Sequence, residues 1–162
     1  MHHFSISHGG SKAELYRDLR LALDGLTAGE PDAIANMANA AALIWEHLPD
    51  LNWAGFYRAI GDGLVLGPFQ GKAACIRIPI GQGVCGTAAA TRASQLVADV
   101  NAFAGHIACD AASASELVVP IVVEERLIGV LDLDSPSIGR FDAEDQAGCE
   151  VLIALLGPRI AG

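Results

Sequence analysis

Between residues 11 and 48, apolar and polar positions alternate with the period of an α-helix. Between residues 11 and 28, leucines and alanines recur every three to four positions, and Gly29 and Pro31 end the pattern. The same spacing returns over residues 31–48, where Pro31 and Asp32 provide a typical helix start. The sequence therefore predicts two amphipathic helices at the N-terminal end.

From residue 52 onward the pattern changes to short apolar and alternating runs bounded by glycine, which predict β-strands. The predicted strands are 52–60, 64–69, 75–80, 95–100, 116–123 and 126–134. Glycine-rich and charged turns join the first two and the last two of these strands into hairpins. A short helix is expected at 84–92, and a closing helix at 142–157 capped by Asp142.

This order of elements predicts one α+β domain over residues 1–162, with a central antiparallel sheet of about six strands. The N- and C-terminal helices would pack on one face of the sheet, and loops and the short helix would cover the other. Residues 1–10 show no periodic pattern and are expected to be flexible. A ligand would bind on the loop face.

Composition narrows the class of protein. Hydrophobic residues make up 52% and charged residues 18% of the chain, which excludes a disordered protein. We find neither an apolar run long enough to cross a membrane nor a signal peptide, so we expect a cytoplasmic protein that does not bind membranes. The net charge of −9 argues against a nucleic-acid partner, because such proteins need a basic surface.

Three acidic residues interrupt the two most hydrophobic strands: Glu116, Asp132 and Asp134. Side chains two apart on a strand share a face, and a three-residue turn at 124–126 would place Glu116 opposite Asp134. A solvated strand end is the simpler explanation. Because like charges directly opposite one another destabilise a sheet, the grouping instead favours a pocket that binds a cation or keeps one acid protonated.

The four cysteines, Cys75, Cys85, Cys109 and Cys149, have distinct settings. Cys149 fits a buried position in the last helix, and Cys85 lies at a helix start, where backbone amides would lower the pKa of its thiol. Cys109 falls in a loop. A zinc site with His106 is one alternative, although the sequence lacks a C-x-x-C pair. The other alternative is a redox pair, in which one thiol attacks a substrate and a second, resolving thiol forms a disulfide with it.

Five blocks of sequence resemble a known family. They are NWAGFY (52–57), LVLGPFQGKAAC (64–75), IPIGQGVCGTA (78–88), HIACDAASASE (106–116) and IGVLDLDS (128–135). Together, from Asn52 to about Asp145, they are similar to the free methionine-(R)-sulfoxide reductases, which are single-domain members of the GAF fold. The blocks are far more specific than the fold, which serves mostly in sensor modules.

The resemblance implies an enzyme that reduces free methionine (R)-sulfoxide and needs neither a bound cofactor nor a metal. Thioredoxin would reduce the oxidised enzyme after each turnover. By motif, Cys109 would be the nucleophile, Cys75 the favoured resolving thiol and Cys85 an accessory or alternative resolver. The disulfide would then form within the chain. Which of the two resolving thiols dominates stays open at this point.

The resemblance also implies a substrate pocket. Glu116, Asp132 and Asp134 would bind the substrate, and Trp53 and Tyr57 would form an aromatic wall against its methyl–sulfur end. Two aromatic residues four apart on a strand also commonly just cover a core. The sequence does not decide which carboxyl group donates a proton.

Two further questions stay open from the sequence. A non-catalytic GAF sensor that binds a small metabolite is the alternative to an enzyme, and turnover of the sulfoxide would distinguish the two. The N-terminal helix pair could also support a homodimer.

Overall fold

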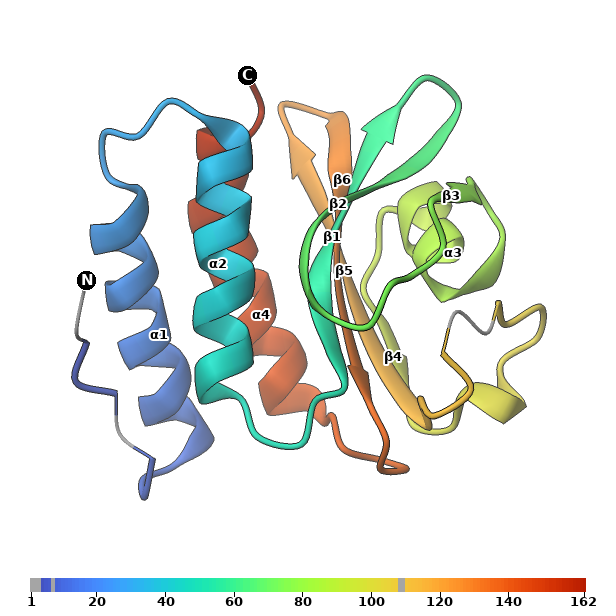
Figure 1. Ribbon diagram of the computed structural model, residues 1–162, viewed down its shortest axis with the longest axis horizontal. Helices are drawn as coiled ribbons and strands as arrows, with labels where there is room; N and C mark the ends of the chain where they lie inside the picture. The colour runs from blue at the N-terminus through green and yellow to red at the C-terminus, as the bar shows by residue number, and fades with distance from the viewer. Residues whose placement is uncertain (1–3, 7, 108–109) are drawn as a thin grey trace.

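An antiparallel sheet of six strands divides the molecule into two layers (Figure 1). The computed structural model describes residues 4–6, 8–107 and 110–162. The strands are β1 (Trp53–Ile60), β2 (Gly63–Gly71), β3 (Arg77–Pro79), β4 (Gln95–Val97), β5 (Ser115–Val123) and β6 (Arg126–Ser135). Their spatial order is β3-β2-β1-β6-β5-β4, so the two long hairpins meet in the middle of the sheet, where β1 pairs with β6.

Helices cover both faces of the sheet unequally. The α-helices are α1 (Lys12–Thr27), α2 (Ala33–His47), α3 (Gly83–Thr91) and α4 (Ala143–Leu156), and η1 (Val100–Ala102) and η2 (Gly157–Arg159) are 3₁₀ turns. Helices α1, α2 and α4 lie on one side of the sheet, and α3 with the loops lies on the other (Figure 1). The predicted α+β architecture is confirmed.

Side-chain capping explains where the long helices begin. The Ser11 hydroxyl accepts a hydrogen bond from the Glu14 amide at 3.2 Å, and the Glu14 carboxylate accepts one from the Ser11 amide at 3.1 Å. Asp142 and Asp145 form the same reciprocal pair at the start of α4, and the Asp32 carboxylate caps α2 by accepting a hydrogen bond from the Ala35 amide. Because these caps satisfy amides that the helix itself leaves unpaired, they fix the helix starts that the sequence predicted.

Strand β1 shows how one sequence supplies two hydrophobic cores. Ala54 and Phe56 are fully buried against the three-helix layer, whereas Trp53 and Tyr57 are buried on the opposite face against α3. Alternate side chains of a strand point to opposite faces, so both cores follow from the period of two. Burying each large apolar side chain contributes roughly 1.5–3 kcal/mol.

The hairpin between β5 and β6 differs from the prediction in its turn. Val123 pairs with Arg126, so the turn consists only of Glu124 and Glu125. Both residues have positive φ angles, 50° and 64°, as a two-residue type I′ turn requires. The predicted three-residue turn at 124–126 is therefore wrong.

A β-bulge nevertheless produces the predicted pairing further along the hairpin. The register shifts by one residue close to the turn, because Ile128 is an extra residue on β6, and beyond this point Glu116 lies opposite Asp134. A bulge opposes two residues on one strand to one on its partner, so it compensates for the shorter turn. The register of the acidic residues thus depends on two irregularities that cancel.

Two other predicted strands are shorter than expected. Of residues 75–80 only Arg77–Pro79 pair with β2, and of residues 95–100 only Gln95–Val97 pair with β5. The second strand ends because the Asp99 carboxylate accepts a hydrogen bond from the Asn101 amide at 2.9 Å and starts η1. Local side-chain hydrogen bonds of this kind compete with strand pairing.

The N-terminal segment touches the helix-side core. Ile6 is buried in that core, and Phe4 packs against it.

Among the described helices, we find none that is both long and apolar enough to cross a lipid bilayer.

The contact between α1 and α4 leads to a stability prediction. At Gly148 an added methyl group would overlap the ring of Tyr16, so we expect Gly148→Ala to lower the free energy of unfolding by about 1–3 kcal/mol. Gly25→Ala in α1 is the matched control. There the nearest atom, from Phe4, is 3.8 Å from the added carbon, and we expect a gain of up to about 1 kcal/mol. Urea denaturation of both variants tests this, and equal effects would contradict the packing described.

Candidate active site

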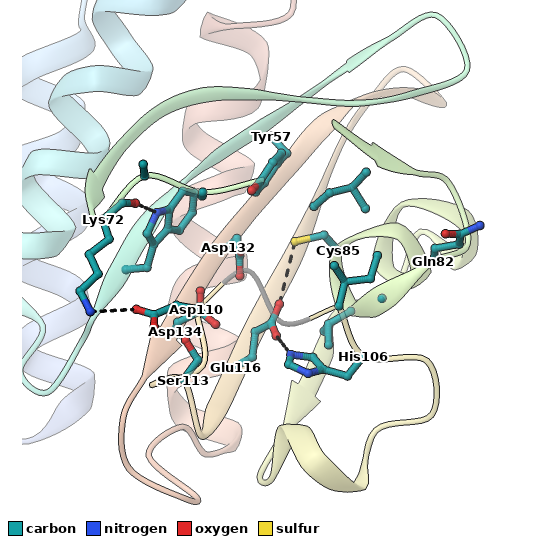
Figure 2. A pocket seen from close by; sticks show the side chains of 17 residues that line it. Tyr57, Lys72, Gln82, Cys85, His106, Asp110, Ser113, Glu116, Asp132 and Asp134 are labelled. Carbon is teal, nitrogen blue, oxygen red and sulfur yellow. Dashed lines mark hydrogen bonds and ion pairs between the residues drawn. The ribbon is translucent and has the colours of Figure 1, made fainter. Parts of the chain in front are cut away.

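A small pocket lies on the α3 side of the sheet (Figure 2). Its floor is formed by β1, β5 and β6, and its walls come from α3, from residues 72–74 and from the described parts of the loop before β5. The side chains that line it include Trp53, Tyr57, Cys85, Glu116, Asp132 and Asp134. The structure therefore brings together six of the eight residues that the sequence analysis selected.

The three carboxyl groups meet in the floor of this pocket. Glu116 and Asp134 are directly opposite one another across β5 and β6, and Asp132 lies two residues before Asp134 on the same face. Only 6% of Glu116 and 6% of Asp132 is exposed. Strand backbones hold all three groups, so the cluster is built on rigid elements.

Burial determines the protonation of this cluster. Loss of solvation raises the pKa of Glu116, Asp132 and Asp134 well above the ordinary carboxyl range, and the negative charges of the neighbouring acids raise it further. Among the described residues, Asp132 Oδ1 has no hydrogen-bond partner. The cluster therefore holds protons at pH values where exposed carboxyl groups are ionised.

Cys85 extends from the first turn of α3 toward these acids (Figure 2). Its Sγ–H donates to Glu116 Oε1 across 3.9 Å, and the side chain is buried. Burial, followed by the charges of Asp132 and Glu116, raises the pKa of the Cys85 thiol well above its usual value. The expectation that the helix start would lower this pKa is wrong, because desolvation and nearby carboxyl groups outweigh the amides of a nine-residue helix.

Trp53 and Tyr57 form an aromatic wall of the pocket. Their ring centroids are 5.8 Å apart, and the Phe69 ring stacks on Trp53 with a centroid distance of 5.2 Å. The Trp53 indole N–H donates to the Lys72 carbonyl at 3.1 Å, and the Tyr57 hydroxyl donates to the Cys75 carbonyl at 3.0 Å. The wall thus holds the segment that carries Cys75 against the pocket.

Apart from Cys85, no cysteine among the described residues lines the pocket. Cys75 is disulfide-bonded, whereas Cys85 and Cys149 carry free thiols. Cys109 lies outside the described residues, so the predicted nucleophile has no position here. Cys149 is fully buried in the helix-side core, where burial raises its pKa to about 12, in keeping with the absence of an assigned role.

The pocket also contains residues that sequence reasoning left out. His106 Nε2 lies 3.6 Å from Glu116 Oε2, and burial lowers the pKa of its imidazole. Lys72 Nζ lies 3.7 Å from Asp110 Oδ2, which joins the two sides of the mouth. His106 and Asp110 belong to the HIACD block itself, so their closeness to Cys109 in the sequence was the signal that could have found them.

One group of side chains in the pocket has the composition of a metal-binding site. Ligand atoms of Cys85, Glu116 and Asp132 all lie within 4.8 Å of one another, and all three residues are buried. The zinc site considered from the sequence combined His106 with Cys75, Cys85 and Cys109. The described residues instead place carboxyl groups beside Cys85.

The chain is similar to proteins of known structure and name. A family model described as GAF domain matches residues 33–160. A relative from Escherichia coli named free methionine-R-sulfoxide reductase is 56% identical over 90% of this chain and 88% of its own length.

Two solved structures extend this similarity. The free methionine-R-sulfoxide reductase from Neisseria meningitidis in complex with its substrate is 43% identical, with a TM-score of 0.94 over 99% of this chain and 96% of that one. The complex of fRMsr of Staphylococcus aureus with substrate is 46% identical, with a TM-score of 0.85 over 90% and 95%.

The buried carboxyl cluster gives a prediction for stability against pH. An acid whose pKa is raised on folding binds a proton in the folded state that it has lost in the unfolded state. The free energy of unfolding therefore falls as pH rises from the ordinary carboxyl pKa toward the raised one. Glu116→Gln should reduce the total fall in the free energy of unfolding between about pH 4 and about pH 8 by on the order of 1–3 kcal/mol.

Glu125→Gln, in the exposed hairpin turn, is the control and should leave the slope unchanged. Urea denaturation across this pH range measures both variants. Parallel curves for the wild type and Glu116→Gln would contradict the raised pKa of Glu116.

Proposed function

Since the chain belongs to the free methionine-R-sulfoxide reductase family of GAF-domain proteins, we propose that it reduces free methionine (R)-sulfoxide to methionine with its own thiols. The observation that carries this proposal is the buried carboxyl cluster beside an aromatic wall in one pocket. The cluster suits the polar groups of a small amino acid, and the wall suits its methyl–sulfur end.

Substrate recognition follows from charge and burial. Free methionine sulfoxide carries an ammonium group, and a carboxylate shielded from water binds such a group through a strong charge-assisted hydrogen bond. Glu116, Asp132 and Asp134 supply the carboxyl groups, and Trp53 and Tyr57 face the apolar end of the ligand. A methionine sulfoxide within a protein lacks the free ammonium group, so this pocket favours the free amino acid.

Proton donation uses the same cluster. Sulfoxide oxygen is a poor leaving group until it is protonated, and an acid kept neutral near pH 7 can provide the proton. Burial raises the pKa of all three carboxyl groups, which supports one of them as general acid while another binds the ammonium group as a carboxylate.

Two thiols of the enzyme carry out the redox steps. The Cys109 thiolate attacks the substrate sulfur and the sulfur–oxygen bond breaks. The oxygen, with the proton from the general acid, ends on Cys109 as a sulfenic acid, and methionine leaves. The thiol of a second cysteine condenses with the sulfenic acid, forming a disulfide and releasing water. Two thiols of thioredoxin reduce this disulfide by exchange, which restores both protein thiols.

We assign the second thiol to Cys75. Cys75 is disulfide-bonded while Cys85 and Cys149 are free, so its bond involves neither of them. Cys85 is buried, and the raised pKa of its thiol leaves little thiolate. Both observations support Cys75 as the resolver and leave Cys85 a part of the pocket wall.

The proposal extends to the surroundings of the enzyme. Thioredoxin is the reductant, and the cytoplasm is the compartment where protein thiols are kept reduced. The net charge of −9 keeps nucleic acid outside the set of partners. No bound cofactor enters the reaction as written.

A coupled turnover assay tests the function. We expect the protein, supplied with thioredoxin, thioredoxin reductase and NADPH, to oxidise NADPH with the free R sulfoxide and not with the S epimer. A sensor would instead bind the ligand, detectable by calorimetry, and consume no NADPH. Equal rates with both epimers would also overturn the proposal.

Serine substitutions test the thiol assignment. Cys109→Ser should lower kcat more than about a hundredfold because the attacking atom is lost. Cys75→Ser should still release one methionine per chain in a single turnover, yet lose steady-state turnover with thioredoxin. Cys85→Ser should retain both, and circular dichroism should show all three folded. Loss of steady-state turnover in Cys85→Ser alone would reverse the assignment of the resolver.

A further inference from the structure

The floor of the pocket also carries side-chain atoms of the types that bind metal ions. The Cys85 sulfur and one oxygen each of Glu116 and Asp132 lie within 4.8 Å of one another. From this arrangement we propose that the pocket, when free of substrate, binds one Zn²⁺ ion through Cys85, Glu116 and Asp132.

The separation of the Cys85 and Glu116 donor atoms fits zinc after a small adjustment. Zinc lies about 2.3 Å from thiolate sulfur and about 2.0 Å from carboxylate oxygen, so a tetrahedral site separates these donors by roughly 3.5 Å. Cys85 Sγ and Glu116 Oε1 are 3.9 Å apart. A shift of a few tenths of an ångström, within the reach of side-chain rotation, brings this pair to that separation.

A separate observation indicates that Asp132 accommodates a ligand. Its Oδ1 atom is buried and has no hydrogen-bond partner within the described part of the chain, and only 6% of the residue is exposed. A buried carboxylate oxygen without a partner is costly unless a cation or donor meets it. Since Asp132 lines the pocket, an ion bound there would provide that partner.

The donor types select zinc over the common alkaline-earth ions. Thiolate is a soft ligand that Mg²⁺ and Ca²⁺ avoid, whereas Zn²⁺ accepts sulfur and carboxylate oxygen together. Three protein ligands leave the fourth position open toward the pocket. Because Glu116 and Asp132 are also the proposed substrate ligands, bound Zn²⁺ and substrate would compete, and this consequence alone rests on the proposed function.

Calorimetric titration with zinc chloride, free of any turnover, tests the site. The background protein carries Cys75→Ser and Cys109→Ser to remove the redox thiols, and His2→Ala, His3→Ala and His8→Ala to remove the N-terminal histidines. We expect one Zn²⁺ per chain. Adding Cys85→Ala or Asp132→Asn should weaken binding by about a hundredfold or more, because each removes a ligand. Adding Cys149→Ala, a buried cysteine of the other core, should change nothing.

Cobalt provides a second measurement on the same proteins. Co²⁺ bound to a thiolate gives a charge-transfer absorption band, which should be present in the background protein and absent after Cys85→Ala. Thermal melting shows whether each variant is folded. If Cys85→Ala does not fold, the Zn²⁺ affinity of Asp132→Asn tests the site in its place. No Zn²⁺ binding in the background protein, or equal binding with and without Cys85 and Asp132, would overturn the site.

The competition arm separates this inference from the proposed function. In the wild-type enzyme Zn²⁺ should raise the apparent KM for free methionine (R)-sulfoxide without lowering kcat at saturating substrate. Zn²⁺ binding without any turnover would refute only the reductase activity. Turnover without Zn²⁺ binding would refute only the metal site.

Discussion

The pairing of Glu116 with Asp134 across two central strands is the constraint on which this site depends. Two carboxyl groups placed opposite one another in a sheet repel when both are ionised, and here Asp132 adds a third. The pocket must therefore keep protons on the acids or place a cation between them. Hydrophobic burial elsewhere in the sheet offsets this penalty, since β5 and β6 also carry fully buried residues such as Leu117 and Leu131.

The two-layer architecture makes such an arrangement tolerable. Each central strand contributes alternate side chains to two cores, so the helix layer anchors the same backbone that presents the acids on the opposite face. A site built on paired strands holds its groups in place more closely than one built on loops. The proposed reaction also needs a loop, because its attacking thiol has to reach both a substrate and a second thiol.

The helical parts of the fold could be predicted because their signals are local. The apolar period and the capping residues Asp32 and Asp142 lie within the helices they start. The grouping of the acids was also predicted, yet the assumed turn was wrong. A two-residue turn and a bulge at Ile128 together give the register expected from a three-residue turn. No local pattern in the sequence distinguishes these two routes.

The chemistry of individual groups was harder to predict, because it depends on neighbours that are distant in the sequence. Cys85 begins a helix, which suggested a reactive thiolate. The acids that raise the pKa of its thiol come from strands about 30 and 47 residues further along the chain. The sequence analysis considered His106 only as a zinc ligand, and only the folded chain places its imidazole beside Glu116.

The proposed reaction and the proposed metal site are two answers to one electrostatic problem. Protons, a substrate ammonium group and Zn²⁺ each bring positive charge to the acidic cluster and so relieve the repulsion among Glu116, Asp132 and Asp134. A pocket that binds the ammonium group of an amino acid this way cannot exclude a small divalent cation by charge alone. Only ligand type and geometry discriminate, and Cys85 supplies the one donor that favours zinc over the amino acid. Replacing Cys85 therefore separates the two kinds of cation while leaving the carboxyl groups unchanged.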